Sequence, residues 1–249
     1  MRRASALAVL LLFAFNAFAF QAFDATQFRT AHPTIGPRLA VASECELMGQ
    51  CDNTDRAPVE ATIKARLARY AGAPALVLDF ESWYPLKDKR LIASAARNAE
   101  WYALVLRWAR EALPGTRLGF FGFPILARYA YSWPADYMAD YMAAHRLLLP
   151  VMNASDALYP EFYLWFREPA LNKFQAWTVT LGRMLGKPVI PFMWHKDPRA
   201  VTADLPDAEL AAQCAFLRTN ADGVAWWSKW SEVYDPASTW ATSAARCFN

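Results

Sequence analysis

Short apolar runs rich in β-branched or aromatic residues alternate with Ala-, Leu- and Arg-rich stretches along this chain. The runs are apolar on both faces, which is typical of strands that are covered from both sides. Parallel sheets with crossover helices have this pattern. The expected strands are 38–43, 75–80, 117–122, 147–152, 161–166, 187–193 and 223–227. The expected helices are 59–70, 92–112, 135–145, 172–185 and 207–219.

The number of these units favours a closed barrel over an open sheet. The chain has 249 residues, which suits one barrel domain, and no internal repeat or long linker divides it. No GxGxxG motif follows the first expected strand, which argues against a dinucleotide-binding sheet. We therefore predict an α/β fold, a single TIM-like (β/α) barrel with about seven parallel strands. In such a barrel, chemistry lies at the carboxyl ends of the strands.

The N-terminal segment is typical of an export signal. Arg2 and Arg3 precede an apolar run that is short for a membrane span, and Ala17-Phe18-Ala19 is a small-x-small cleavage pattern. We predict a signal peptide at 1–19 and a mature barrel domain at 20–249, secreted or periplasmic. No stable membrane insertion is expected after cleavage, and an uncleaved anchor is the alternative.

The cysteine count and the net charge indicate disulfides and argue against a metal site and a nucleic-acid partner. Cys45, Cys51, Cys214 and Cys247 form an even set in an exported chain, which favours disulfides. Of the three possible connectivities, the simplest pairs the first two and the last two cysteines. No CxxC motif or neighbouring His supports zinc, so we expect no metal and no cofactor. Signal cleavage lowers the formal charge of +3 by two, and nucleic acid is therefore not expected as a partner.

Two carboxylates end one of the most apolar runs. Asp79 and Glu81 follow Leu76-Val77-Leu78 and are separated by Phe80. Because strand side chains alternate, Asp79 and Glu81 point to the same side. Two close carboxylates retain a shared proton, which general-acid cleavage of a glycosidic bond requires. The alternative is that one carboxylate caps the next helix and the other is solvated. The 11 Trp, 10 Tyr and 16 Phe suit a sugar-stacking cleft, although core packing also uses them.

The residues around this pair resemble a known family. Asp79-Phe80-Glu81-Ser82-Trp83-Tyr84-Pro85 resembles the acid-bearing Asp-x-Glu-x-Trp-x-Pro segment of the animal and venom hyaluronidases. Further short matches follow in the same order at 119–124, 157–160, 162–164, 187–192, 205–210 and 223–227. Together they extend from Ala75 to Trp230. The family has an α/β barrel with about seven strands, in agreement with the strand pattern.

The resemblance implies an activity and a set of roles. Members cleave the β-linkage after an N-acetylhexosamine with retention, and the sugar's own acetamido carbonyl is the nucleophile, an exception to the two-carboxylate rule. Glu81 is then the acid/base, and Asp79 orients the acetamido group. Tyr159 would hydrogen-bond that group, and Trp227 would form an apolar wall. A polysaccharide of hyaluronan or chondroitin type is the implied substrate.

Other residues near the matched segments have weaker support. Trp83 and Tyr84 are either substrate-binding platforms or packing for the loop, and Asp156, with Asn153, lies near an expected strand end. Strand alternation allows only one of Trp226 and Trp227 to line the barrel. His32, His145 and His195 are scattered, so a histidine triad is poorly supported, and His195 is more simply a loop residue.

Two other functions stay open. Phe121 stands where the family has a substrate-binding Tyr, which favours a non-catalytic glycan-binding barrel. The intact Asp79/Glu81 pair opposes that alternative. A glycosidase with two distant carboxylates, in which Glu161 or Glu232 is the partner of Glu81, is the third hypothesis. The sequence does not indicate an oligomeric state.

Overall fold

The computed structural model describes residues 20–27, 35–84, 93–124, 135–164, 169–198, 200, 203–229 and 231–248. The predicted signal peptide at 1–19 lies outside the described residues, as do His32, Pro85 and Trp230.

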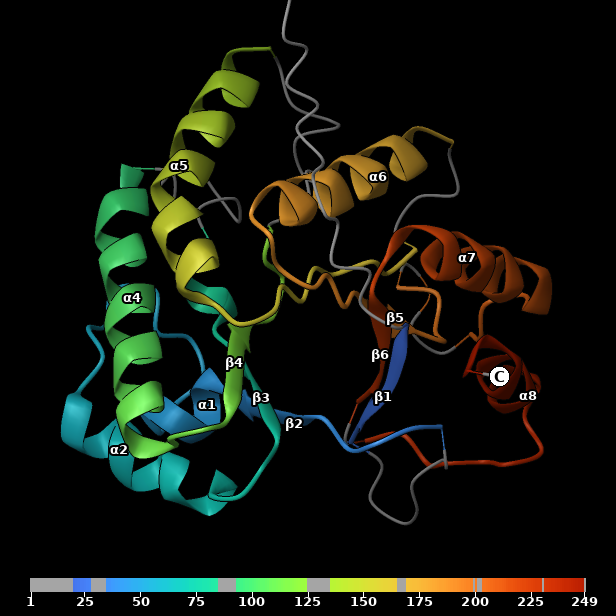
Figure 1. Cartoon of the computed structure of the whole chain (residues 1–249), viewed down its shortest axis with the longest axis horizontal. Helices are drawn as coiled ribbons and strands as arrows, with labels where there is room; N and C mark the ends of the chain where they lie inside the picture. Colours follow the sequence, from blue (N-terminus) through green and yellow to red (C-terminus); the bar gives the residue numbers. More distant parts are fainter. Residues whose placement is uncertain are drawn as a thin grey trace, which may run out of the picture.

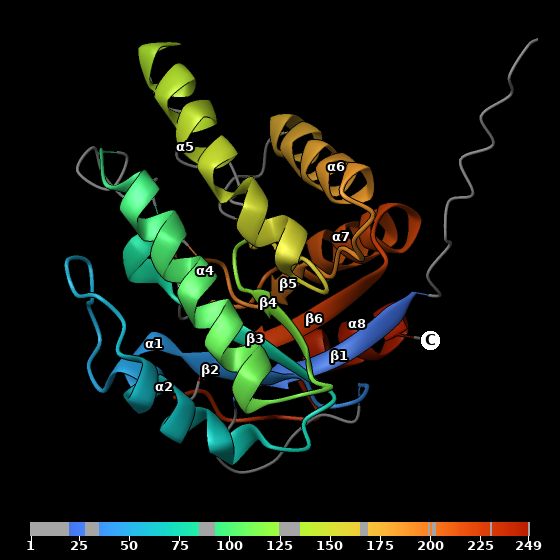
Figure 2. The same cartoon turned by 60° about the vertical axis from the view of Figure 1, so that its left-hand side comes forward.

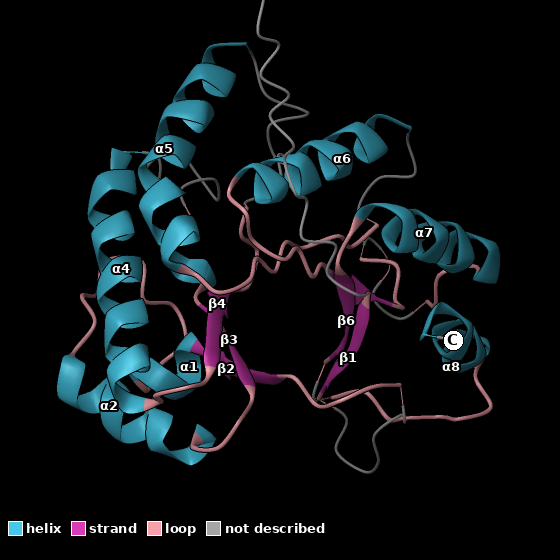
Figure 3. Ribbon diagram, in the orientation of Figure 1, coloured by secondary structure: helices cyan, strands magenta, loops and turns pink. Residues whose placement is uncertain are grey.

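In the described part of the chain, six strands form two parallel sheets. The sequence predicts parallel strands, but in one barrel of about seven. One sheet has the order β1-β6-β5 and the other the order β2-β3-β4. The strands are β1 (Gln21–Thr26), β2 (Ala40–Ser43), β3 (Ala75–Asp79), β4 (Arg117–Phe120), β5 (Phe192–Trp194) and β6 (Gly223–Ser228). The two sheets lie opposite each other at the centre of the molecule, and the helices lie outside them (Figure 3). The α/β class predicted from the sequence is confirmed.

Isolated parallel bridges lie beside the edges of the two sheets. The bridge between Asp24 and Arg38 joins β1 to the residues just before β2. On the other side, Phe121, directly after β4, pairs with Tyr159. The segment that contains Tyr159 also pairs with the β5 region, through bridges from Leu158 to Val189 and from Glu161 to Phe192. Residues 158–161 therefore lie between β4 and β5.

The helices follow the strands along the chain (Figure 1). Figure 2 shows α4 and α5 side by side over the β2-β3-β4 sheet. The short 3-10 turns are η1 (Ala68–Tyr70) and η2 (Glu81–Trp83). The α-helices are α1 (Glu44–Met48), α2 (Glu60–Leu67), α4 (Ala95–Ala112), α5 (Ala135–Ala154), α6 (Pro169–Met184), α7 (Asp207–Asn220) and α8 (Thr239–Phe248).

The strand predicted at 147–152 is wrong, because these residues lie inside α5. Leu148, Val151 and Met152 are buried, whereas Leu147 and Pro150 are exposed. That spacing of three and four residues is helical, and a short apolar run does not by itself distinguish a helix from a strand. Strand β1 was not predicted, because its polar residues interrupt the apolar pattern.

The core divides into two aromatic clusters. The first packs under β3 and β4 and includes Phe80, Tyr102 and Phe120, with Tyr102 edge-on to Phe120 at 4.9 Å. The second lies between β6 and helices α7 and α8, where Trp226 stacks on Trp240. The disulfide Cys214–Cys247 joins α7 to α8, and Cys45–Cys51 closes a loop after β2, as the simplest connectivity predicts. No helix in the described part of the chain is long and apolar enough to cross a membrane.

Candidate active site

A cavity of about 170 Å³ opens at the carboxyl ends of the strands. Asp79 is the last residue of β3, and Glu81 opens η2 directly after it. Both side chains line the cavity, while Phe80 between them is completely buried in the core. The alternation expected of a strand therefore places the two carboxylates at one site and leaves both half-buried.

Glu161 adds a third carboxylate to the wall. It lies next to the bridge with Phe192 and is 6% exposed. Tyr84 lies close to all three acids. Its burial and, after that, the charges of neighbours that include Glu81, Asp79 and Glu161 raise the pKa of its phenol well above the usual range. The cavity is thus strongly acidic around the end of β3.

Aromatic rings also line the cavity. Trp227 of β6 lies nearly parallel to Tyr163 at a centroid distance of 5.6 Å, and Trp194 of β5 meets Trp227 edge-on at 5.2 Å. Phe121 also lines the cavity and lies 6.2 Å from Tyr163. Trp226 points to the other side of β6, into the second core cluster. A cavity lined by both aromatic rings and carboxylates suits a sugar ring.

Tyr159 does not line this cavity, although the resemblance implied that it contacts substrate. Its ring is 1% exposed and lies in the space that Gly119 leaves, where an added Cβ would be 2.8 Å from the ring atom Cε2. Burial raises the pKa of Tyr159 to about 12, with smaller effects from Arg117 and Asp156. Tyr159 is thus packed against β4 and is not among the residues that line the cavity with the carboxylates.

Tyr163 lines the cavity in its place. The sequence contained a signal for this residue. Tyr159, Glu161 and Tyr163 have the spacing of one strand face, and the last of them lies nearest the carboxyl end. The side chains of Glu161 and Tyr163 both reach the cavity, as this spacing indicates.

Three other predicted site residues have structural roles. Trp83 is completely buried and packs on Phe80 at 4.7 Å, so its ring is not available to a sugar. Tyr84 is buried and donates its hydroxyl to the Phe121 carbonyl oxygen at 2.6 Å. Asp156 accepts from Leu118 N and from Arg110 Nη2, both at 2.9 Å, near the start of β4. Asn153 is exposed on α5.

A polar network that the sequence did not reveal lies behind the aromatic wall. Glu232 Oε1 accepts from Trp194 Nε1 and from Lys229 N, both at 3.1 Å. Its Oε2 lies 2.9 Å from Nε2 of His195, which is buried and stacks on Trp240. Burial opposes the charge on Glu232, but its hydrogen bonds and the His195 charge outweigh this and lower its pKa.

Lys229 brings a positive charge to the cavity. Its Nζ lies 4.8 Å from the centre of the Trp194 ring, and the side chain lines the same cavity as the three carboxylates. A cation over an indole face is held electrostatically by the ring. In the described part of the chain, no cluster of three His, Cys, Asp or Glu side chains is arranged to hold a metal ion.

Comparisons with known proteins give a fold and no sequence family. No family model matches the chain, and no curated protein matches it. Among solved structures, bee venom hyaluronidase is similar, with a TM-score of 0.65 and 14% identity over 91% of this chain and 100% of the other. The chain has a hyaluronidase-like α/β fold. Bee venom hyaluronidase in complex with a hyaluronic acid tetramer is similar too, with a TM-score of 0.56 and 17% identity over 78% and 79% of the two chains.

Proposed function

We propose that this protein is an exported glycoside hydrolase that cleaves a β-linkage beside an N-acetylhexosamine in a polysaccharide of hyaluronan or chondroitin type. The observation that carries the proposal is the cavity that Asp79 and Glu81 line together with Tyr163 and Trp227. The hyaluronidase-like fold supports it, and one similar structure holds a hyaluronic acid tetramer.

In this proposal, Glu81 protonates the leaving oxygen while the substrate's acetamido carbonyl oxygen attacks the anomeric carbon. Water then attacks the same carbon, gives its proton to the Glu81 carboxylate and reopens the oxazolinium ring. Asp79 accepts a hydrogen bond from the acetamido N–H and orients the group for attack. A positioned acid/base of this kind contributes about 10²–10⁴-fold to the rate.

Tyr163 and Trp227 complete the site in this mechanism. The Tyr163 hydroxyl takes the role that the resemblance gave to Tyr159, and it donates to the acetamido oxygen as charge develops there. Trp227 packs its ring against the acetyl methyl and the sugar face. Their contact supports a joint role, because the two rings lie 5.6 Å apart and both residues line the cavity.

We also propose that the two sheets belong to one closed barrel of seven parallel segments. Residues 158–161 supply the seventh segment, between β4 and β5, and the bridge from Asp24 to Arg38 joins β1 to β2. Closure explains why the carboxyl ends of separate sheets contribute to one cavity.

Lys229 supports an acidic polymer as the substrate. Three carboxylates repel a polyanion, and a cation at the cavity wall offsets that repulsion where a uronic acid neighbours the N-acetylhexosamine. Phe121 favours a second candidate, a glycan-binding protein without turnover, because Phe lacks the hydroxyl found at this place in the hyaluronidase motif.

Product release from hyaluronan, chondroitin and chitin-type oligomers distinguishes these candidates. The wild type and Glu100→Gln, an exposed control on α4, are expected to release reducing ends, whereas Glu81→Gln is not. A thiazoline analogue of N-acetylglucosamine, which mimics the oxazolinium, is expected to inhibit competitively. Glycan binding by all three proteins with no product from any of them would support the non-catalytic candidate instead.

The same assay distinguishes the third hypothesis. If Glu161 were a covalent nucleophile, Glu161→Gln would abolish turnover and the thiazoline would not inhibit. If the substrate supplies the nucleophile, Glu161→Gln retains turnover. Glu232 is less suited to such a role, because its two oxygens already contact Trp194, Lys229 and His195.

A further inference from the structure

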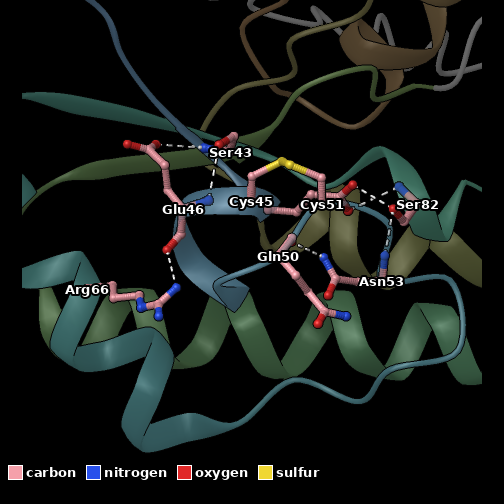
Figure 4. Close-up of a disulfide and its surroundings, with 9 residues drawn as sticks. Ser43, Cys45, Glu46, Gln50, Cys51, Asn53, Arg66 and Ser82 are labelled. Carbon is pink, nitrogen blue, oxygen red and sulfur yellow. Dashed lines mark hydrogen bonds between the residues drawn. A yellow bond between two sulfur atoms is a disulfide. The ribbon is translucent and has the colours of Figure 1, made fainter.

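We infer that the disulfide loop, residues 44–53, is a positioning device for the acid/base Glu81 and acts through the neighbouring residue Ser82. The inference rests on the proposed function, since it assigns Glu81 a catalytic role. The loop runs from the start of α1 to the residues after the Cys45–Cys51 disulfide (Figure 4).

Ser82 binds both ends of the disulfide loop. Glu44 accepts from Ser82 N at 3.1 Å through Oε2 and from Ser82 Oγ at 2.5 Å through Oε1. At the other end, Asn53 N donates to Ser82 Oγ at 3.0 Å (Figure 4). Ser82 is 4% exposed, so these hydrogen bonds are largely shielded from water. The residue directly after Glu81 thus has its backbone and its hydroxyl fixed by one loop.

The two residues after Ser82, Trp83 and Tyr84, also hold the turn that carries Glu81. Trp83 Nε1 donates to the Asn53 carbonyl oxygen at 2.9 Å, and the Trp83 carbonyl oxygen accepts from Asn98 Nδ2 on α4 at 2.9 Å. Tyr84 N donates to the Glu81 carbonyl oxygen at 3.3 Å and closes η2. Every residue from Glu81 to Tyr84 therefore has a defined contact, and Asn53 supplies two of them.

The disulfide lies between the two ends that bind Ser82. Cys45 follows Glu44 directly, and Cys51 lies two residues before Asn53. Without the covalent link, the loop gains conformational freedom, and Glu44 and Asn53 reach Ser82 together less often. Gly49 has a left-handed backbone with φ of 85° and donates to the Cys45 carbonyl oxygen at 3.0 Å, which turns the chain back.

Displacement of Glu81 has a direct chemical cost. A shift of about 1 Å in a reacting group lowers a rate by about 100-fold, because the acid no longer points at the leaving oxygen. Loss of the contacts to Ser82 is therefore expected to lower kcat, while KM, which depends on the rest of the cavity, changes little.

A matched pair of Glu→Gln substitutions, one inside the disulfide loop and one outside it, tests this role. Glu44→Gln places an amide NH₂ against Ser82 and is expected to lower kcat about 10-fold or more, with KM within about twofold. Glu60→Gln on α2 is the control, because Glu60 lies outside the disulfide loop and pairs with Lys64 at 2.6 Å. It is expected to leave kcat unchanged.

Two further variants keep the test informative if one protein folds poorly. Ser82→Ala is expected to lower kcat, and the double variant with Glu44→Gln to lose little more, because both changes remove the same contact. Cys45→Ala/Cys51→Ala is expected to have a lower kcat even at assay temperatures well below its melting temperature, where the variant is folded. Cys214→Ala/Cys247→Ala, which opens the disulfide between α7 and α8, is expected to lower stability only.

The outcomes separate this inference from the proposed function. If the wild type turns over and Glu44→Gln keeps the kcat of the Glu60→Gln control, the positioning role is wrong and the proposed hydrolase stands. Additive losses in Glu44→Gln and Ser82→Ala would also contradict action through Ser82. If the wild type releases no product from any N-acetylated polysaccharide, both proposals fail.

Discussion

Tyr163→Phe is the substitution that best tests the assignment of the aromatic wall. It removes one hydroxyl and keeps the ring that contacts Trp227 and Phe121. A hydrogen bond to a group that gains charge contributes about 1.5–3 kcal/mol. At 1.36 kcal/mol per factor of ten, kcat is expected to fall about 10- to 150-fold.

Tyr159→Phe is the matched control from the same segment. Tyr159 is not among the residues that line the cavity, and its ring packs against Gly119 and Phe192. Because Phe fills the same space, we expect kcat within about twofold of the wild type and a small change in melting temperature.

The assay measures reducing ends released over a range of substrate concentrations, so that kcat and KM separate for each variant. Circular dichroism before and after the assay confirms that both variants are folded. A fully active Tyr163→Phe beside an inactive Tyr159→Phe would refute the assignment and restore Tyr159 as the residue that contacts the acetamido group.

Three other predictions follow from single residues. Gly122→Ala is expected to lower the free energy of unfolding by about 2 kcal/mol or more, because Gly122 has a φ of 76° and an added Cβ would lie 2.0 Å from the Tyr84 hydroxyl. Gly72→Ala is the control: its φ is 84° and no atom lies near the added Cβ, so the free energy of unfolding should fall by about 1 kcal/mol in the same urea titration. Lys229→Met is expected to lower kcat/KM on hyaluronan more than on neutral chitin-type oligomers. Equal losses on both substrates, or an equal effect from the control Lys196→Met, would exclude a role of Lys229 in the recognition of acidic sugars. Burial lowers the pKa of His145 from 6.5 to about 4. As the pH falls from 6.5 toward 4, His145 is protonated in the unfolded chain before it is protonated in the folded protein, so the free energy of unfolding falls by about 3 kcal/mol. His145→Gln should flatten that part of the pH profile measured by urea unfolding.

Strands β3 and β6 were predictable because their sequences are largely apolar on both faces, whereas β1, which contains polar residues, was not predicted. The predicted strand 75–80 is β3 (Ala75–Asp79), and the predicted strand 223–227 is β6 (Gly223–Ser228). The run at 147–152 is also apolar but belongs to α5. There the identity of the element depends on which face is buried, and that is decided by packing against α4 rather than by local sequence.

The site was predictable where one strand carries it. Strand alternation is enough to place Asp79 and Glu81 together, and the same period orders Tyr159 and Tyr163 along one face. The contacts of Glu232 with Trp194 and of Glu44 with Ser82 join residues 38 positions apart. Such contacts depend on how separate loops meet at the end of the sheets, and no local pattern specifies them.

The most direct test of the proposed hydrolase is the size of hyaluronan after incubation with the wild type and with Glu81→Gln. We predict that the wild type shortens the polymer and forms one new reducing end per cleavage, while the folded Glu81→Gln variant leaves it intact. Equal shortening by both proteins would contradict the role of Glu81. An intact polymer with the wild type, on hyaluronan and on every other N-acetylated polysaccharide in the panel, would contradict the activity itself.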